Sequence, residues 1–234
     1  MKIDTKDISL QQAVVMGSNL LGFGKGLAAQ EREDVRNTLQ LATLVANKSF
    51  DKKTQAEAWF NRLLSVMADT GWLTLTARYG ACNESSQTVK LHNVLLNVLE
   101  TAVRHAVAST QAGAVLSALA GETLARLPRQ GDAIELYKNS SRTDTGAIMG
   151  VASCARDPEG EIILAMSVVD AATEHHDHDM LLLDWSSDKA RLHQASMVLT
   201  MAPAMFARSR EGVAQALGHR AEENIKTYLD LLKA

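Results

Sequence analysis

The chain has 234 residues, of which 46% are hydrophobic and only 4% aromatic, and its formal net charge is -3. This balance is typical of a folded globular protein and excludes a disordered or collagen-like chain, while the scattered Lys and Arg residues provide no basic stripe for nucleic acid. The cysteines, Cys82 and Cys154, lie far apart without metal-ligand spacing, which excludes a zinc ribbon and a disulfide scaffold and favours a reducing compartment.

The first half of the chain is predicted to be mainly helical. Apolar residues recur at near-helical spacing over 9–21, and the glycine-rich segment 22–26 predicts a connector after that helix. The same periodicity and the capping signals predict helices over 30–48, 51–71, 85–103 and 109–127. A short strand is expected over 72–77, because apolar and polar residues alternate there.

The second half of the chain is predicted to form an antiparallel meander. The segment Asp157-Pro158-Glu159-Gly160 has the residue preferences of a type I turn and joins two strands. Pro203 suits the first turn of a long C-terminal helix. The five strands are expected over 133–137, 147–155, 162–169, 180–185 and 191–201.

Together these elements predict an α+β fold, because the strands follow one another instead of alternating with helices. We expect one domain over residues 1–234, in which 1–131 form a mainly helical half and 132–234 form the sheet and the C-terminal helix. Burial is expected for a set of large side chains, namely Trp59, Leu63, Leu95, Leu164, Leu183 and Val213.

The chain gives no signal for insertion into a membrane. Two acidic residues precede the first weak apolar stretch, so we expect no Sec-type signal peptide. No window reaches the roughly 18 uninterrupted apolar residues of a spanning helix. Any association with a membrane is therefore expected to be peripheral or through a lipid.

A cluster of imidazoles and carboxylates over 174–179 is the first candidate for chemistry. His175, His176 and His178 could ligate a transition metal. However, adjacent positions in a loop do not form a preorganised site, and the i, i+4 spacing of helical metal sites is absent. We therefore expect a solvated loop between strands, with a metal-dependent enzyme or hydrolase kept as an alternative.

Small residues mark a second candidate, on the helix predicted over 109–127. Gly113, Ser117 and Gly121 recur every four residues and leave a stripe without bulk along one side. Tight helix packing is the simpler interpretation, and a groove for an acyl chain is the alternative.

Cys154 is the third candidate. With a period of two, Gly150, Ala152 and Cys154 share one face of the predicted strand, which leaves space beside the sulfur. Cysteines of this kind commonly act as small buried hydrophobes. The spacing alone therefore permits either a structural thiol or an attachment point for an apolar group.

Several short motifs resemble a known bacterial family. They include the stretch 136–141, the Ala152-Ser153-Cys154 step, the Asp157 to Gly160 turn and the segments 183–187 and 218–221. Together they resemble the family of the Erwinia virulence factor over most of the chain. The resemblance implies a non-enzymatic factor for bacterial persistence in an insect gut, an intertwined fold of two α/β subdomains, and a palmitoyl group on the cysteine that matches Cys154.

The leading functional hypothesis is therefore a virulence or host-persistence factor that is palmitoylated and peripherally associated with membranes. Its partner would be an acyl chain or a membrane surface, with covalent palmitate in place of a cofactor, and its location the bacterial cytoplasm or membrane periphery, with non-classical export as an option. The acyl groove would be lined by Gly150, Ala152, Gly113, Ser117 and Gly121. A structural interaction module remains a further alternative.

Overall fold

The computed structural model describes residues 10–81, 88–107, 111–127, 131–143, 146–172, 184–186 and 191–231. The fold is α+β, as predicted. Contacts within the chain define two compact units: the sheet unit, Met1–Leu27 with Thr74–Thr200, and the helical unit, Ala28–Leu73 with Met201–Ala234. Each unit thus combines segments that are distant in sequence. The single domain expected over 1–234 stays a prediction.

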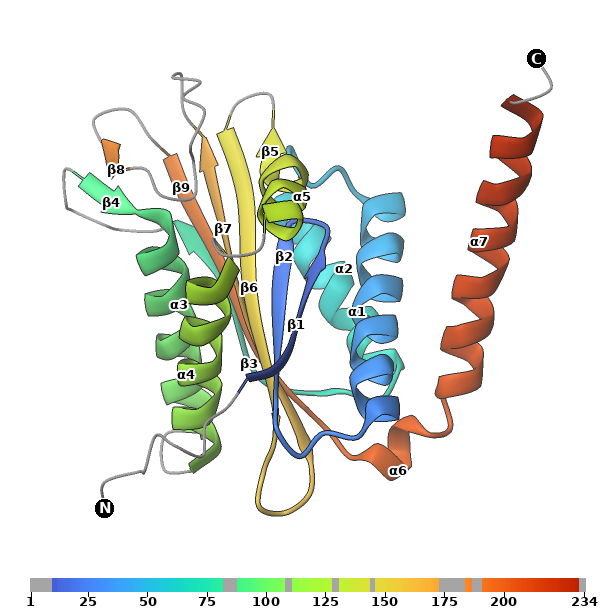
Figure 1. Cartoon of the computed structure of the whole chain (residues 1–234), viewed down its shortest axis with the longest axis horizontal. Helices are drawn as coiled ribbons and strands as arrows, with labels where there is room; N and C mark the ends of the chain where they lie inside the picture. The colour runs from blue at the N-terminus through green and yellow to red at the C-terminus, as the bar shows by residue number, and fades with distance from the viewer. Residues whose placement is uncertain are drawn as a thin grey trace. The chain divides into compact units, whose positions relative to one another are not determined.

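A mixed sheet forms the centre of the sheet unit (Figure 1). Its strands follow the order β1-β2-β6-β7-β9-β3, and the short β5 pairs with β6. β2 runs parallel to β6, whereas β1–β2, β5–β6 and β6–β7 are antiparallel pairs. A separate two-stranded sheet pairs β4 with β8. The bounds are β1 Leu10–Met16, β2 Asn19–Gly24, β3 Leu73–Ala81, β4 Thr88–Lys90, β5 Arg142–Thr143, β6 Gly146–Arg156, β7 Ile162–Ala172, β8 Asp184–Ser186 and β9 Arg191–Met201.

The hairpin of β6 and β7 forms as the sequence predicts. The Gly160 amide donates to the Asp157 carbonyl at 3.1 Å, and the Glu161 amide donates to the Asp157 carboxylate at 2.8 Å. Gly160 has a φ of +91°, a conformation that glycine adopts without the steric cost of a Cβ. Because the turn sets the register, Cys154 lies opposite Leu164.

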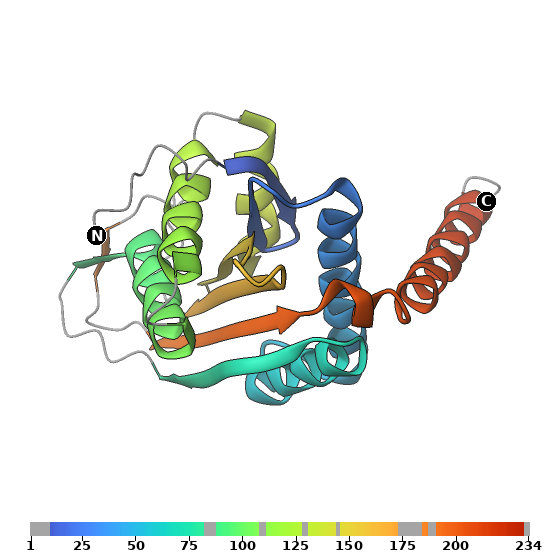
Figure 2. The same ribbon diagram turned by 90° about the horizontal axis from the view of Figure 1, so that it is seen from below.

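Three helices accompany this sheet. α3 (Leu91–Val107) and α4 (Gln111–Arg126) lie side by side on one face, as the two views in Figures 1 and 2 show. α3 packs on β7, and α4 packs on β6 and β2. α5 (Gly131–Ser141) contacts β1, β2 and β6. The apolar core between the sheet and the two long helices includes Leu95, Leu99, Leu116, Leu119, Met149 and Val151.

Glycine allows α4 to approach β2 closely. A Cβ added at Gly22 would overlap the Thr123 hydroxyl, and one added at Gly24 would lie 2.9 Å from the Cδ1 atom of Leu119. Thr123 itself donates a hydrogen bond of 2.6 Å to the Leu119 carbonyl within α4. The glycine-rich segment 22–26, expected as a connector, therefore begins inside a buried strand.

The helical unit contains α1 (Ala29–Ser49), α2 (Ala56–Asp69), α6 (Pro203–Phe206) and α7 (Arg210–Leu231). α1 packs against α2 and α7. The buried Asp34 carboxylate of α1 accepts two hydrogen bonds from the Arg210 guanidinium, at 2.9 and 2.6 Å. This bidentate pair joins the two segments of the helical unit. Its buried apolar residues include Val35, Leu39, Trp59, Phe60, Leu63, Met67 and Val213.

Two local predictions are wrong. In the segment 9–21, expected as a helix, residues 10–16 form β1 and residues 19–21 begin β2, and a two-residue turn joins these strands through Gly17 at a φ of +59°. The segment 133–137, expected as a strand, lies in α5. Its alternating pattern is short enough to suit either structure, and the buried Tyr137 and Ser141 lie four residues apart, which is helical spacing.

The predicted five-strand meander is also wrong in its connectivity. β6 and β7 form a consecutive hairpin, but β2 from the N-terminal segment pairs in parallel with β6. At the other end of the sheet, β3 from the first half of the chain pairs with β9. The sheet is therefore mixed and recruits strands from both halves of the sequence.

Burial agrees with the predicted core. Trp59, Leu63, Leu95, Leu164 and Val213 are all buried, and Leu183 lies outside the described residues.

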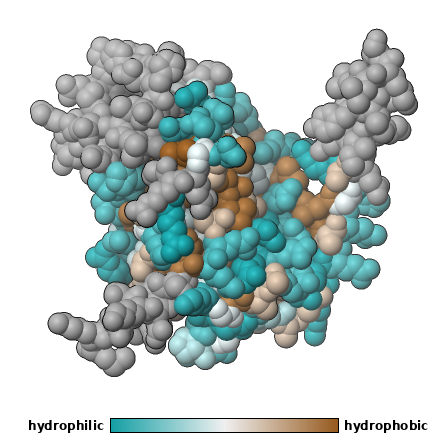
Figure 3. Space-filling view, viewed as in Figure 1, coloured by the Kyte–Doolittle hydropathy of each residue, from teal (hydrophilic) through white to brown (hydrophobic). Residues whose placement is uncertain are grey.

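The surface is mostly polar on the face drawn in Figure 3, where hydrophobic residues form small separate patches. The large hydrophobic side chains that are exposed within the described ranges are Leu73, Leu75, Leu136 and Met205. None of the helices in these ranges has the length and apolar character needed to cross a bilayer.

Candidate functional site

Cys154 is a buried residue of β6. It is near the end of β6, between Phe23 of β2 and Leu164 of β7 in the register of the sheet. All three side chains have exposed fractions of 0%. The thiol is therefore surrounded by strand neighbours that are apolar and closed to solvent.

The side chain of Cys154 lies on the sheet face opposite the helices α3 and α4. Ala147, Met149 and Val151 of β6 belong to the core beneath those helices. Because side chains alternate along a strand, Ala152 and Cys154 point to the other face. Both are nonetheless buried, with exposed fractions of 1% and 0%. The environment of the thiol is thus distinct from the core that α4 covers.

One of the two small residues predicted to leave space beside Cys154 is already covered. A Cβ added at Gly150 would overlap the side-chain oxygen of Asn19 on β2, so this amide already covers the glycine. Ala152 lies between Gly150 and Cys154 on the same face and contributes only a methyl group. Gly150 therefore leaves no space for an apolar adduct, and Ala152 is the remaining small neighbour of the sulfur on this face.

The stripe of Gly113, Ser117 and Gly121 runs along α4. A Cβ at Gly113 would lie 3.0 Å from the Val107 carbonyl oxygen, which indicates close packing, whereas one at Gly121 would meet no atom within 4 Å. α4 covers the sheet face opposite Cys154. The structure therefore does not bring this stripe together with the Cys154 face of β6.

The remaining candidate residues are not among those that the structure describes. The histidine cluster with His175, His176 and His178 and the second cysteine, Cys82, lie outside the described residues. Within the ranges that are described, no group of three or more His, Cys, Asp or Glu side chains is arranged to hold a metal ion.

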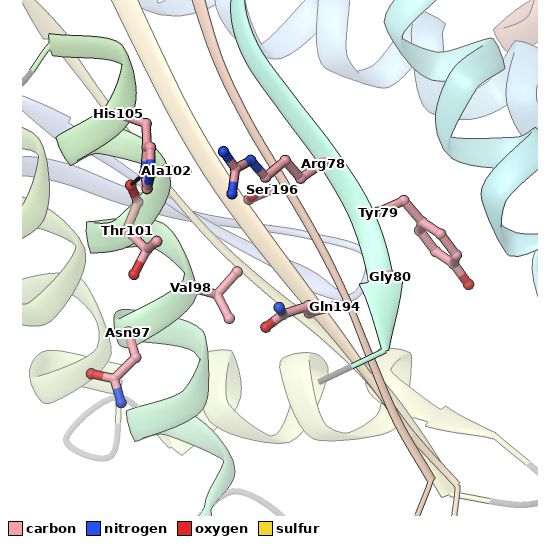
Figure 4. A pocket seen from close by; sticks show the side chains of 10 residues that line it. All are labelled: Arg78, Tyr79, Gly80, Asn97, Val98, Thr101, Ala102, His105, Gln194 and Ser196. Atoms are coloured by element: carbon pink, nitrogen blue, oxygen red, sulfur yellow. Dashed lines mark hydrogen bonds between the residues drawn. The ribbon is translucent and has the colours of Figure 1, made fainter. Parts of the chain in front are cut away.

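A polar cavity of about 280 Å³, which we call the edge pocket, lies between α3 and the strands β3 and β9 (Figure 4). The Arg78 side chain extends from β3 into the pocket, while the neighbouring Tyr79 points away from it. Tyr79 instead stacks on His193 of β9, with ring centroids 6.2 Å apart. The polar side chains that line the pocket are Arg78, Asn97, Thr101, His105, Gln194 and Ser196.

The spacing of these residues explains how three elements build the pocket. Asn97, Thr101 and His105 recur every four residues and share one side of α3. Gln194 and Ser196 are two residues apart on β9 and share a sheet face. His105 Nδ1 lies 2.7 Å from the Thr101 carbonyl oxygen, which orients the ring along the helix.

Sequence reasoning missed the edge pocket. The i, i+4, i+8 series of polar residues on α3 was the available signal, because it makes a polar stripe along one side of the helix. The pairing of β3 with β9 was not predicted, and this pairing brings Arg78 to the stripe.

Comparisons with known proteins give little further information. No family model matches the chain, and no curated protein matches it. A solved structure named delta-endotoxin is similar with a TM-score of 0.48 and 11% sequence identity, and the match covers 81% of this chain and 85% of that one. This similarity is too distant to transfer any property of the toxin.

Proposed function

We propose that the protein is a non-enzymatic bacterial virulence or host-persistence factor, S-acylated on Cys154 and peripherally associated with membranes. The resemblance to the Erwinia virulence factor family suggests the biological role. The observation that carries the proposal for this residue is the complete burial of Cys154 between apolar residues of the two adjacent strands.

The chemistry of an acyl thioester suits that environment. A palmitoyl chain gains about 0.8 kcal/mol for each methylene removed from water, so it binds in an apolar interior or in a bilayer. Phe23 and Leu164 flank the sulfur on the adjacent strands and would contact the first carbons of the chain. The proposed groove would begin beside Ala152, whose side chain is only a methyl group.

The positions of Asn19 and α4 restrict the path that the acyl chain could take. The Asn19 amide covers Gly150, and the α4 stripe lies on the opposite face of the sheet. We therefore retain Cys154 and Ala152 as the centre of the proposed groove and assign no contact to Gly113, Ser117 or Gly121.

Burial also affects when acylation could occur. An acyl donor cannot reach a thiol with an exposed fraction of 0% unless the fold opens locally. We therefore expect acylation during folding, before Cys154 is buried. For the same reason Cys154 is poorly placed to act as a nucleophile on substrates, since reactive cysteines are partly exposed.

The test is intact-mass spectrometry of protein purified from its bacterial host, with and without hydroxylamine, which cleaves thioesters. We expect a palmitoyl adduct that hydroxylamine removes. Cys154→Ser should lose the adduct and partition less into a detergent phase, whereas the matched Cys82→Ser variant should keep both properties. An unmodified wild-type mass, or an adduct that follows Cys82, would refute acylation of Cys154.

One acyl chain by itself would anchor the protein only weakly, because a single acyl group gives marginal and reversible membrane binding. We therefore expect the acylated protein to divide between soluble and membrane fractions. Quantitative acylation with no membrane-bound fraction would separate the lipid from membrane association and favour a palmitate that is purely structural.

A further inference from the structure

We propose that the edge pocket is a second functional site, which binds the phosphate group of a small phosphate ester or of a phospholipid headgroup. This inference is independent of acylation at Cys154. It rests on the charge, the donors and the size of the pocket.

The charge of the lining favours an anion. Arg78 projects into the cavity from β3, and none of the described residues that line the pocket is Asp or Glu. Within the described part of the chain, Arg78 forms no ion pair. Its guanidinium therefore has its planar donor array available for a ligand, and this array matches two oxygens of a phosphate group.

The other polar groups of the lining add donors to that of Arg78. The hydroxyls of Thr101 and Ser196 and the amide of Gln194 line the cavity from two further elements. Hydroxyl and amide groups donate to phosphate oxygens without adding charge. Ser196 of β9 is buried, whereas Thr101 of α3 is exposed. A phosphate held by Arg78 would thus meet donors from both the sheet and the helix.

The size of the pocket limits the ligand. Pockets for drug-sized molecules occupy about 300–1,000 Å³, so a cavity of about 280 Å³ suits a phosphate with a short polar substituent. Gly80 lines the pocket without a side chain, and a Cβ added there would meet no atom within 4 Å. Gly80 therefore keeps this part of the lining open.

Calorimetric titration of the Cys154→Ser protein tests the proposal without interference from an acyl chain. The probes are inorganic phosphate and glycerol 3-phosphate, for which we expect saturable binding with a Kd of about 0.1 to 1 mM, given the few contacts that so small a pocket offers. Arg78→Gln should weaken binding at least about tenfold. Arg104→Gln removes the same charge from α3 outside the pocket lining and should change affinity less than about twofold.

Vesicles distinguish the two sources of phosphate. Co-sedimentation is compared for vesicles of phosphatidylglycerol and vesicles of a galactosyl diacylglycerol, which has no phosphate. Arg78-dependent binding to the first vesicle alone identifies a headgroup, and Arg78-dependent binding of the soluble probes alone identifies a free ester. Gly80→Val provides a steric test, because it narrows the pocket without changing charge and should weaken whichever interaction is found.

Two results would overturn the proposal. One is the absence of saturable binding to both the soluble probes and the phosphatidylglycerol vesicles. The other is binding that Arg78→Gln and Arg104→Gln weaken equally, because that would indicate a general electrostatic attraction. Circular dichroism of each variant establishes that the fold is intact, and neither result bears on the acylation of Cys154.

Discussion

Strands β6 and β3 belong to the same sheet, but β6 is almost entirely buried and β3 is not. The first ten of the eleven residues of β6 are buried, whereas none of the nine residues of β3 is buried. β6 pairs with β2 and β7 on its two sides, while β3 is the end strand beside β9. A central strand therefore supplies the interior, including Cys154, and an edge strand supplies a surface on which Arg78 can meet a ligand.

The largest expected effect comes from emptying the interior next to β6. Leu164→Ala removes a fully buried side chain opposite Cys154, and we expect the free energy of unfolding to fall by about 2 to 5 kcal/mol. Leu75→Ala on β3 is the matched change, and its side chain is 43% exposed, so the loss should stay below about 1 kcal/mol. Urea unfolding followed by circular dichroism measures both. Equal losses would contradict the contrast between centre and edge.

A second contrast uses two strand glycines. Gly22→Ala on β2 places a methyl group against the Thr123 hydroxyl beneath α4, and we expect a cost of about 1 to 3 kcal/mol from overpacking. Gly80→Ala on β3 adds the same group in open space and should change stability by less than about 0.5 kcal/mol. Thr123→Ala should recover part of the loss in a double-mutant cycle. Strict additivity would show that α4 does not press on Gly22.

A smaller effect on stability is expected from the hydrogen bond that joins α5 to β6. The buried Tyr137 hydroxyl donates a hydrogen bond of 2.9 Å to the Gly150 carbonyl. Tyr137→Phe leaves that carbonyl buried without this donor, and we expect a loss of about 1 to 2 kcal/mol at neutral pH. Chemical unfolding of the two proteins side by side gives the value, and no measurable loss would mean that water replaces the phenol.

The same residue predicts a dependence on alkaline pH. Burial raises the pKa of the Tyr137 phenol above its ordinary value, so the folded state keeps a proton that the unfolded state releases. The stabilisation is complete below the unfolded pKa of about 10 and declines as the pH rises above it. Wild-type stability should therefore fall more steeply above that pH than the stability of Tyr137→Phe. Parallel curves in pH-dependent unfolding would contradict this assignment.

The smallest effect on stability is expected at the edge pocket. Arg78 is exposed and forms no ion pair within the described residues, so Arg78→Gln should change the free energy of unfolding by less than about 0.5 kcal/mol. Thermal unfolding of the variant without ligand checks this. A large loss would mean that Arg78 supports the sheet edge and would remove the distinction between a structural centre and a binding edge.

The elements predicted correctly have strong local signals. Helices α1 to α4 each show apolar residues at helical spacing, and the hairpin of β6 and β7 has a turn whose residue types fit its geometry. The failures lie where the signal is short or ambiguous. The local pattern predicts a connector at Gly22 and Gly24, yet α4 requires these glycines inside a buried strand, because their role depends on a helix about a hundred residues away.

The candidate sites differ in the same way. Alternation along one strand was enough to place Cys154 on the same face as Gly150 and Ala152, because that relation needs only the geometry of β6. The covering of Gly150 by Asn19 depends on the parallel pairing of β2 with β6, which no local pattern indicated. The joining of Arg78 to the polar stripe on α3 depends on the pairing of β3 with β9.

Local pattern therefore accounts for most helices, the central hairpin, the apolar core positions and the face on which Cys154 lies, since each follows from the spacing of side chains along a single element. The order of the strands, the separation of Cys154 from the α4 stripe and the existence of the edge pocket come from tertiary structure. These features depend on pairings between segments distant in sequence, and such pairings are selected by the total burial and hydrogen bonding of the folded chain.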